Sequence, residues 1–145
     1  MISRIRGTLV ERKENTVYLQ NDGMTYEVWI PASIMRNLDN HIVDNQLELI
    51  TYYYHQLEPS RAIPILIGFI NEVEREFFER FITVSGVGPK AAVKALTQPF
   101  PLIAKAIDEG DIDLLRSMPG IGPQRAKEII AKLQGKVGKF ALIQE

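Results

Sequence analysis

The chain has 145 residues, and 46% of them are hydrophobic, so it can bury a core in one domain or in two small ones. The absence of cysteine excludes disulfides, thiolate catalysis and cysteine-ligated zinc. A formal net charge of −1 excludes a nonspecific polycation, and no apolar run approaches the roughly 20 residues needed to cross a bilayer. Residues 1–7 lack a secretory apolar segment, so we expect a cytoplasmic protein without a membrane partner.

The first seventy residues predict a small β-barrel. Candidate strands cover residues 4–10, 16–20, 24–30, 47–54 and 63–70. Asn21-Asp22-Gly23 is a hairpin turn signal, and Pro64 suits an edge strand or a bulge. Residues 31–38 fit either a short helix or a loop. Five short strands in this length are typical of a Greek-key barrel of the OB type.

Aromatic residues of the barrel have two interpretations. Tyr26, Trp29 and Tyr52-Tyr53-Tyr54 resemble a base-stacking platform, or alternate members are barrel core. Stacking platforms usually have basic neighbours, whereas residues 1–71 carry six Lys/Arg against eight Asp/Glu. We therefore favour the core.

The composition changes at Asn71, where Asn71 and Glu74 resemble a helix cap. Two apolar helix faces follow: Val73, Phe77, Phe78, Phe81 and Ile82, and, after Pro101, Leu102, Ile103, Ala106 and Ile107 before Gly110 ends the helix. We predict an α+β chain with a five-stranded OB-type barrel domain at 1–70. An all-α tandem helix-hairpin-helix domain follows at 71–136, and a tail or the start of a linker at 137–145.

The tandem is predicted from a near-copy repeat, Gly-Val-Gly at 86–88 and Gly-Ile-Gly at 120–122, which lie 34 residues apart. Glycine at both positions permits a sharp turn with positive φ and a close approach of phosphate. We expect Val87 and Ile121 to plug into the core. Pro89 and Pro123 suit the first helical position, and the following helix start presents amide groups and its positive end to a DNA phosphate.

One Gly-x-Gly before a helix is more often a plain interhelical turn. The repeat, the shared proline and the shared apolar plug favour a phosphate-binding pair instead. Neither copy is a Walker loop or a dinucleotide fingerprint. The predicted DNA-binding residues are Gly86, Val87, Gly88, Lys90, Gly120, Ile121, Gly122, Arg125 and Lys127.

Residues 123–139 are basic, with five Lys/Arg against one Glu, a local charge of +4. A charge run is usually a solvated helix face. Because this one adjoins a phosphate-type turn, we favour contact with a nucleic-acid backbone.

We expect no catalytic residue, metal or cofactor. His41 and His55 are interpreted as surface or loop histidines. The acidic residues of 108–113 lack the spacing of a calcium loop and suit helix capping. Base-excision glycosylases also carry a helix-hairpin-helix, but a catalytic Lys or Asp follows it in a larger domain, and no Asp follows Gly122.

Three stretches accompany the hairpins: Met1-Ile2 with Arg4-Ile5-Arg6-Gly7, Tyr26-Glu27-Val28 before Pro31, and Gly68-Phe69. Across nearly all of the chain, this combination resembles the RuvA family, the Holliday-junction-binding subunits of bacterial branch-migration complexes. The resemblance implies a homotetramer or octamer that holds four-way junction DNA open and flat. Its hairpins would grip each arm through minor-groove phosphates, independently of sequence.

The resemblance also implies partners and biological roles. A RuvB motor ATPase would supply ATPase and helicase activity, and a RuvC resolvase would act on the same junction. The expected roles are DNA recombination, DNA repair and the SOS response to DNA damage.

Three departures from the family pattern affect these expectations. Pro123-Gln124 stands where the family often has two basic residues, so we expect the two hairpins to contribute unequally to DNA binding. The family's acidic pin, a carboxylate pair between late barrel strands, is reduced to Glu58 with Arg61 nearby, which puts strand separation by repulsion in doubt. The sequence ends at Glu145, before the family's motor-docking domain, so motor recruitment is not carried over.

Two alternatives stay open at this point. A protein-binding scaffold or general duplex-binding module could use the same hairpins. A repair enzyme with unrecognised chemistry is the third hypothesis.

Overall fold

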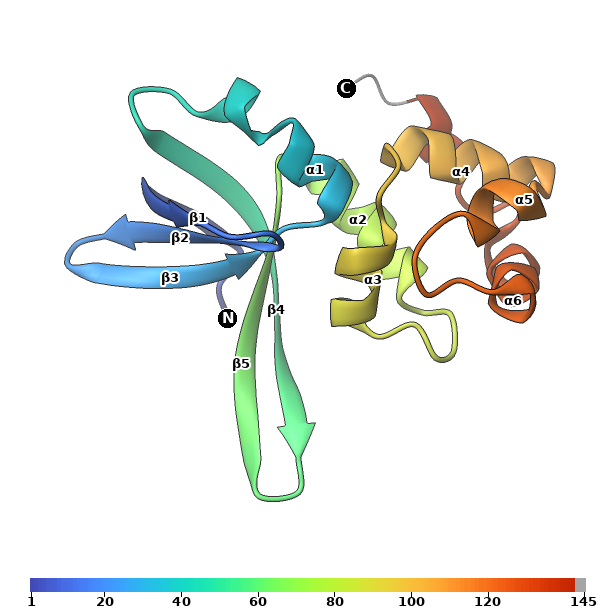
Figure 1. Ribbon diagram of the computed structural model, residues 1–145, viewed down its shortest axis with the longest axis horizontal. Coiled ribbons are helices and arrows are strands. Elements are labelled where there is room, and N and C mark those ends of the chain that lie inside the picture. The colour runs from blue at the N-terminus through green and yellow to red at the C-terminus, as the bar shows by residue number, and fades with distance from the viewer. Residues whose placement is uncertain (143–145) are drawn as a thin grey trace. The chain divides into compact units, whose positions relative to one another are not determined.

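The computed structural model describes residues 1–142 (Figure 1). Its contacts divide the chain into two compact units, one from Met1 to Arg75 and one that begins at Glu76. The first unit contains all five described strands, and the second contains most of the helices. The α+β class expected from the sequence is therefore confirmed.

The first unit is a closed five-stranded barrel, as predicted. Its strands are β1 (Arg4–Arg12), β2 (Thr16–Asn21), β3 (Met24–Trp29), β4 (Gln46–Glu58) and β5 (Arg61–Phe69), closed in the order β1-β2-β3-β5-β4. Neighbouring strands are antiparallel except β3 and β5, which pair in parallel where Trp29 meets Ile67. The turn between β2 and β3 has positive φ at Asp22 and Gly23, which confirms the hairpin signal.

A short helical segment joins β3 to β4. It comprises α1 (Ala32–Arg36) and a 3₁₀ turn (Leu38–His41). Of the two interpretations of residues 31–38, the helix is therefore confirmed. Ile34 and Leu38 are buried, so the segment contributes two side chains to the core.

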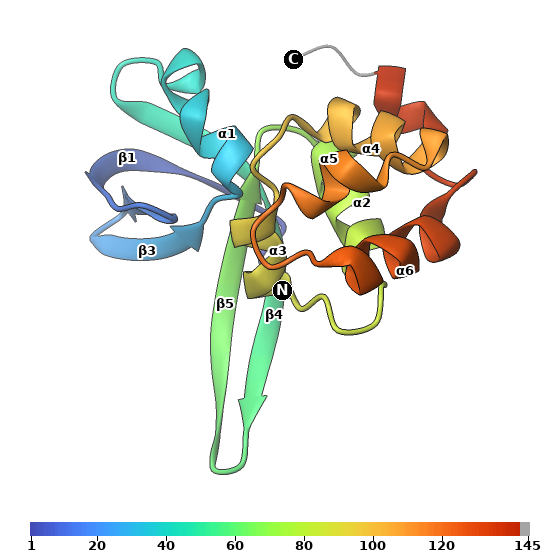
Figure 2. The ribbon, with the colours of Figure 1, turned by 45° about the vertical axis from the view of Figure 1, so that its right-hand side comes forward.

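The β4–β5 hairpin extends past the barrel, because β4 ends at Glu58 and β5 begins at Arg61, both longer than predicted. Strand β1 pairs with β4 only over residues 46–50, whereas β5 pairs with β4 as far as Glu58 and Arg61. Figures 1 and 2 show the resulting two-stranded ribbon reaching away from the other strands. Pro64 lies in this ribbon opposite His55, at an edge, as its missing amide requires.

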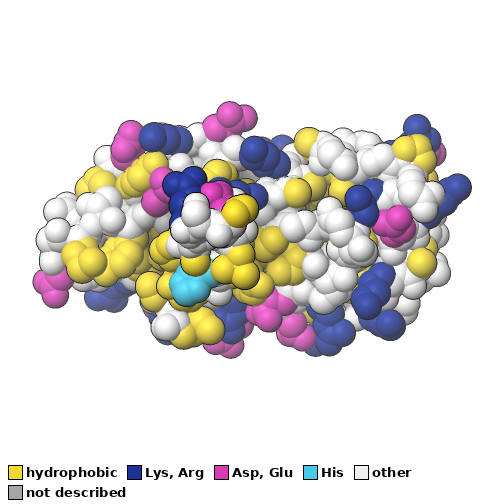
Figure 3. Space-filling model, turned by 90° about the horizontal axis from the view of Figure 1, so that it is seen from below, with side chains coloured by type: hydrophobic (Ala, Val, Ile, Leu, Met, Phe, Trp, Pro, Cys, Tyr) yellow, Lys and Arg dark blue, Asp and Glu magenta, His cyan; other side chains and the backbone are white. Residues whose placement is uncertain are grey.

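The tyrosines of this ribbon are half-exposed, so the prediction that alternate members are barrel core is wrong. The rings of Tyr52 and Tyr54 lie 5.8 Å apart on one face, and on the other the Tyr53 hydroxyl lies 3.0 Å from Nε2 of His55. The error arose because the strand continues past the point where the barrel can bury it. Hydrophobic side chains gather around a histidine where the ribbon points toward the viewer in Figure 3.

The second unit is helical. It contains most of α2 (Glu72–Phe81), then α3 (Pro89–Ala95), α4 (Phe100–Glu109), α5 (Ile112–Arg116), α6 (Pro123–Leu133) and a 3₁₀ turn (Gly138–Leu142). The predicted cap of α2 is confirmed: Oδ1 of Asn71 accepts from the Glu74 amide at 2.8 Å. Oε1 of Glu74 accepts from the Ile70 amide, one residue before the usual capping-box donor.

Phe77 is the centre of the helical core. Its ring centroid lies 5.1 Å from that of Phe100, 5.4 Å from Phe140 and 6.1 Å from Phe81, and all four side chains are fully buried. Val137 is also buried, so residues after 136 pack into this unit. The core therefore packs α2, the first helix of the unit, against its last described 3₁₀ turn.

Two members of the predicted apolar faces are exposed. Val73 and Leu102 are each 41% exposed, whereas Phe77, Phe78 and Phe81 are buried as expected. Leu102 lies two residues after the buried Phe100, and residues two apart do not share a helix face. The assignment of Leu102 to the core face is therefore wrong.

Helix α4 ends as predicted. Gly110 has φ 69°, the left-handed conformation of a helix C-cap. Oδ1 of Asp111 accepts from the Leu114 amide at 3.1 Å and caps α5. Oδ1 of Asp108 accepts from the Gly135 amide, so this acidic stretch serves local structure. Within residues 1–142, no group of three or more metal-ligating side chains is brought together.

The pKa of Glu76 provides a test of the helical unit. A hydrogen bond of 2.6 Å from the Lys139 ammonium lowers this pKa below its usual 4.5, against partial desolvation, and the charges of Lys139 and Arg80 add to the effect. The ion pair stabilises the fold above the ordinary pKa and is lost as pH falls through the lowered value. Lys139→Met should therefore raise the Glu76 pKa, measured by NMR titration of its carboxyl carbon.

The exposed neighbour Lys136 supplies the control. Lys136→Met should leave the Glu76 pKa at its wild-type value. An unchanged pKa in Lys139→Met would show that the pair does not form in solution.

None of the helices within the described residues has the length and apolar character that a bilayer-spanning helix needs.

Candidate nucleic-acid interface

The two Gly-x-Gly turns have the same backbone geometry. Gly86 and Gly120 have φ of 82° and 79°, in the left-handed region that favours glycine. In each turn the central residue donates its amide to the carbonyl three residues earlier, Val87 to Val84 and Ile121 to Met118, both at 3.1 Å. The sequence repeat is therefore a structural repeat.

The second glycine of each turn differs from the prediction. Gly88 and Gly122 have φ of −79° and −88°, which any residue can adopt, so positive φ is required only at the first glycine. Each is the N-cap of the following helix, with Pro89 or Pro123 at its first position, as expected. Among the described residues, no atom lies within 4 Å of a Cβ built at Gly88 or Gly122. Both positions are open to an approaching group.

The predicted apolar plugs are confirmed. Val87 is 5% exposed and Ile121 is 7% exposed. Behind them Ala92 and Ala126 are fully buried, and the amide of each donates at 2.9 Å to the carbonyl of Gly88 or Gly122. The turns are fixed from inside while their outer backbone faces solvent.

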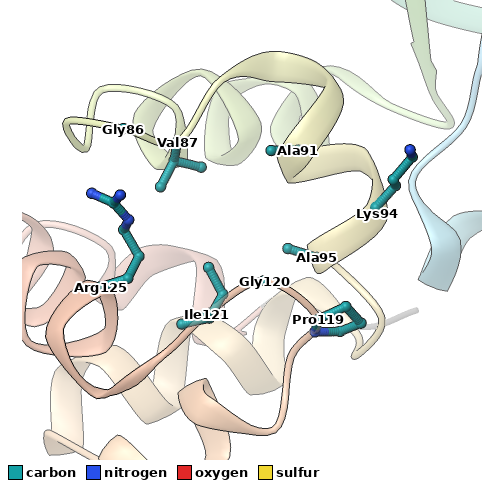
Figure 4. Close-up of a pocket in the computed structure, with 9 residues that line it drawn as sticks. All are labelled: Gly86, Val87, Ala91, Lys94, Ala95, Pro119, Gly120, Ile121 and Arg125. Carbon is teal, nitrogen blue, oxygen red and sulfur yellow. The ribbon is translucent and has the colours of Figure 1, made fainter.

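A groove of about 270 Å³ lies between the turns. Figure 4 shows Val87 and Ile121 facing each other across it. Residues at equivalent positions of the repeat line it from both sides, together with further residues of α3 and the second turn. The lining residues are Gly86, Val87, Ala91, Lys94, Ala95, Pro119, Gly120, Ile121 and Arg125. The fold thus brings together most of the predicted site residues of both turns.

The predicted cations lie in different surroundings. Lys127 is exposed on α6, and Lys90 is half-buried at the second residue of α3. Arg125 turns toward the first hairpin: its Nη1 donates to the carbonyl of Ser85 and lies 2.7 Å from Oε2 of Glu128. The arginine predicted to grip phosphate is therefore held by two protein acceptors.

Lys94 was missed by the sequence analysis. It is exposed on α3, lies beside the groove and points away from Arg125 (Figure 4). Lys94 follows Lys90 by four residues, so both lie on one side of the helix. This spacing could have identified Lys94 from the sequence.

The remaining sequence candidates lie elsewhere. Glu58, the candidate acidic pin, lies at the end of β4, and Nε of Arg61 donates to its Oε2 at 2.6 Å across the turn. This pair neutralises the carboxylate locally. His41 and His55 are exposed, which confirms the surface interpretation.

Two family models match the chain. One, described as the RuvA N terminal domain, matches residues 1–57. The other, described as a SAM-like helix-hairpin-helix tandem, matches residues 78–135 and so covers both turns.

Curated proteins named Holliday junction branch migration complex subunit RuvA are similar over almost the whole chain. The protein from Desulfosudis oleivorans is 39% identical over 141 residues, which is 97% of this chain and 68% of that protein. Its counterpart from Desulfatibacillum aliphaticivorans is 40% identical over the same shares. The Rhodopirellula baltica protein is 38% identical over 99% of this chain and 70% of its own length. This chain thus spans about two thirds of these relatives.

Proposed function

Because this chain belongs to the RuvA family, we propose that it is a non-catalytic DNA-binding subunit that recognises four-way junctions and supports branch migration. The observation that carries the proposal is the duplicated turn, because two turns with the same backbone geometry and an open second glycine suit a ligand with regularly spaced anionic groups. A DNA arm presents such groups along both strands. This role lies in recombination and repair.

We assign phosphate binding to the outer faces of the two turns. The open positions at Gly88 and Gly122 let a phosphate oxygen approach the backbone closely. The amides of a helix's first turn have no acceptor within the helix. Gly122 is the N-cap of α6, so the first-turn amides of this helix lie next to Gly122 and can donate to a phosphate there. Lys90, Lys94 and Lys127 add full charge beside the turns. Contacts of this kind position DNA without reading its sequence.

Four subunits around one junction would provide one pair of turns for each arm. We therefore assign the chain to a homotetramer, with an octamer as the sandwich of two tetramers around the same DNA. A motor ATPase of the RuvB type would move the arms and a RuvC-type resolvase would cut them. These partners follow from family membership.

Salt dependence of junction binding tests the proposal. Each phosphate neutralised by a lysine or arginine contributes about −0.9 to the slope of log affinity against log salt, so one such contact at each of the eight turns of a tetramer predicts a slope near −7. Gel shifts with junction, duplex and single-stranded DNA at several salt concentrations measure it. We expect the junction to be preferred at every salt concentration.

The native mass of the free protein and of the complex accompanies this experiment. Equal affinity for all three DNAs would contradict junction recognition and favour a general duplex-binding module. Absence of DNA binding with retention of a protein partner would favour a scaffold.

A further inference from the structure

We propose that Arg125 is a positioning residue that ties the helix of the second hairpin to the turn of the first, so that both turns grip DNA as one unit. The proposal rests on the proposed function, since a fixed spacing between the turns matters only if both meet the same DNA arm. It assigns Arg125 a role other than the phosphate contact that its position in the sequence predicts.

The contacts of the guanidinium define the tie. Its Nη1 donates to the carbonyl of Ser85, forty residues earlier and directly before Gly86, and to Oε2 of Glu128 one turn along α6 at 2.7 Å. Glu128 therefore holds the guanidinium from its own helix while Ser85 receives it from the other hairpin. Figure 4 shows the side chain reaching from α6 toward the turn that carries Gly86 and Val87.

The first turn is shaped around this side chain. A Cβ at Gly86 would lie 2.5 Å from Nη2 and 2.6 Å from Cζ of Arg125, so the guanidinium would have to move to make room for it. At the equivalent Gly120, no described atom lies within 4 Å of a built Cβ. Positive φ favours glycine at both positions, but only at Gly86 would a side chain also displace the guanidinium of Arg125.

The tie is not duplicated by the repeat. The position equivalent to Arg125 is Ala91, 34 residues earlier, and both line the groove. The position equivalent to Glu128 is Lys94. Thus the first hairpin has no arginine–glutamate pair at the equivalent positions, and the small Ala91 leaves the groove open on its side.

Arginine suits this role better than lysine. Its planar fork carries five donors in fixed directions, so one group can bond a carbonyl and a carboxylate together. A contact of this type fixes two segments before the ligand arrives, which lowers the ordering cost of binding. The side chain is 34% exposed, so the contact lies at the surface where the turns would meet DNA.

The double variant Arg125→Met/Glu128→Gln tests the tie at constant net charge. If Arg125 positions the first turn, affinity for a four-way junction falls severalfold while the salt slope stays at the wild-type value, because no phosphate contact is lost. If Arg125 contacts phosphate, the slope falls by about 0.9 for each subunit bound, and the proposal is overturned. Lys127→Gln, on the same helix, is the control that should lower the slope by that amount.

Hydrogen exchange of the free protein supplies a readout that needs no DNA. We expect the Val87 amide, which bonds to Val84, to exchange at least tenfold faster in the double variant, with the Ile121 amide unchanged. Glu128→Gln alone should leave the Ser85 contact and the Val87 rate intact. An unchanged Val87 rate in the double variant would overturn the tie whether or not the wild type binds junctions. Failure of the wild type to bind junctions would instead overturn the proposed function.

Discussion

Replacing Gly88 and Gly122 together by aspartate is expected to lower junction affinity at least about 100-fold, or roughly 2.8 kcal/mol, without loss of stability. Both glycines are N-caps in extended backbone, and a Cβ meets no described atom there. Aspartate is a better N-cap than glycine by a few tenths of a kcal/mol. The same carboxylate would occupy and repel the position that we assign to phosphate.

The aspartate variant is expected to lose DNA affinity while it keeps or gains stability, so a loss of binding cannot be attributed to unfolding. Gel shifts give the affinity and urea unfolding gives the stability. Asparagine at both positions is the matched control, because it caps equally well and has nearly the same size without the charge. It should bind DNA more weakly than the wild type and more tightly than the aspartate variant. Wild-type affinity in the aspartate variant would refute the assignment of phosphate to these turns.

Phe77→Ala is expected to destabilise the helical unit by about 3–5 kcal/mol. Phe77 is fully buried and contacts rings from α2, α4 and the last 3₁₀ turn. Its removal leaves a cavity where these elements meet. Urea unfolding followed by far-UV circular dichroism measures the loss, because the helices dominate that signal.

The barrel offers an internal reference for this variant. Trp29, the only tryptophan of the chain, lies in β3, so its fluorescence reports the barrel unit separately. Leu102→Ala is the matched control, since Leu102 is 41% exposed, and it should change stability by less than about 0.5 kcal/mol. A loss below 1 kcal/mol in Phe77→Ala would contradict the central place of this ring.

The sequence predicted the parts of this molecule that depend on local chemistry. The five strands follow from runs of β-branched and aromatic residues. Single residues with a known local preference predict the turn at Asp22-Gly23, the cap at Asn71 and the C-cap at Gly110. The duplicated turn was also predictable, because glycine, apolar plug and proline recur at one spacing. Family membership agrees with the resemblance drawn from these features.

Features that depend on tertiary contacts were not predictable. Nothing near Arg125 in the sequence points to Ser85, forty residues away, so its charge was assigned to DNA. The exposure of Leu102 depends on which helix face meets the core. The half-exposed tyrosines of β4 depend on where the barrel closes, and a strand pattern alone does not show where its neighbours stop.

The β4–β5 ribbon is long compared with the grooves of DNA. Residues 53–58 of β4 pair only with β5 among the described strands, and at roughly 3.3 Å per residue they span about 20 Å. A B-DNA major groove is about 12 Å wide, so the ribbon is longer than such a groove is across. Its tip, the paired Glu58 and Arg61, can therefore reach a ligand that the barrel itself never touches.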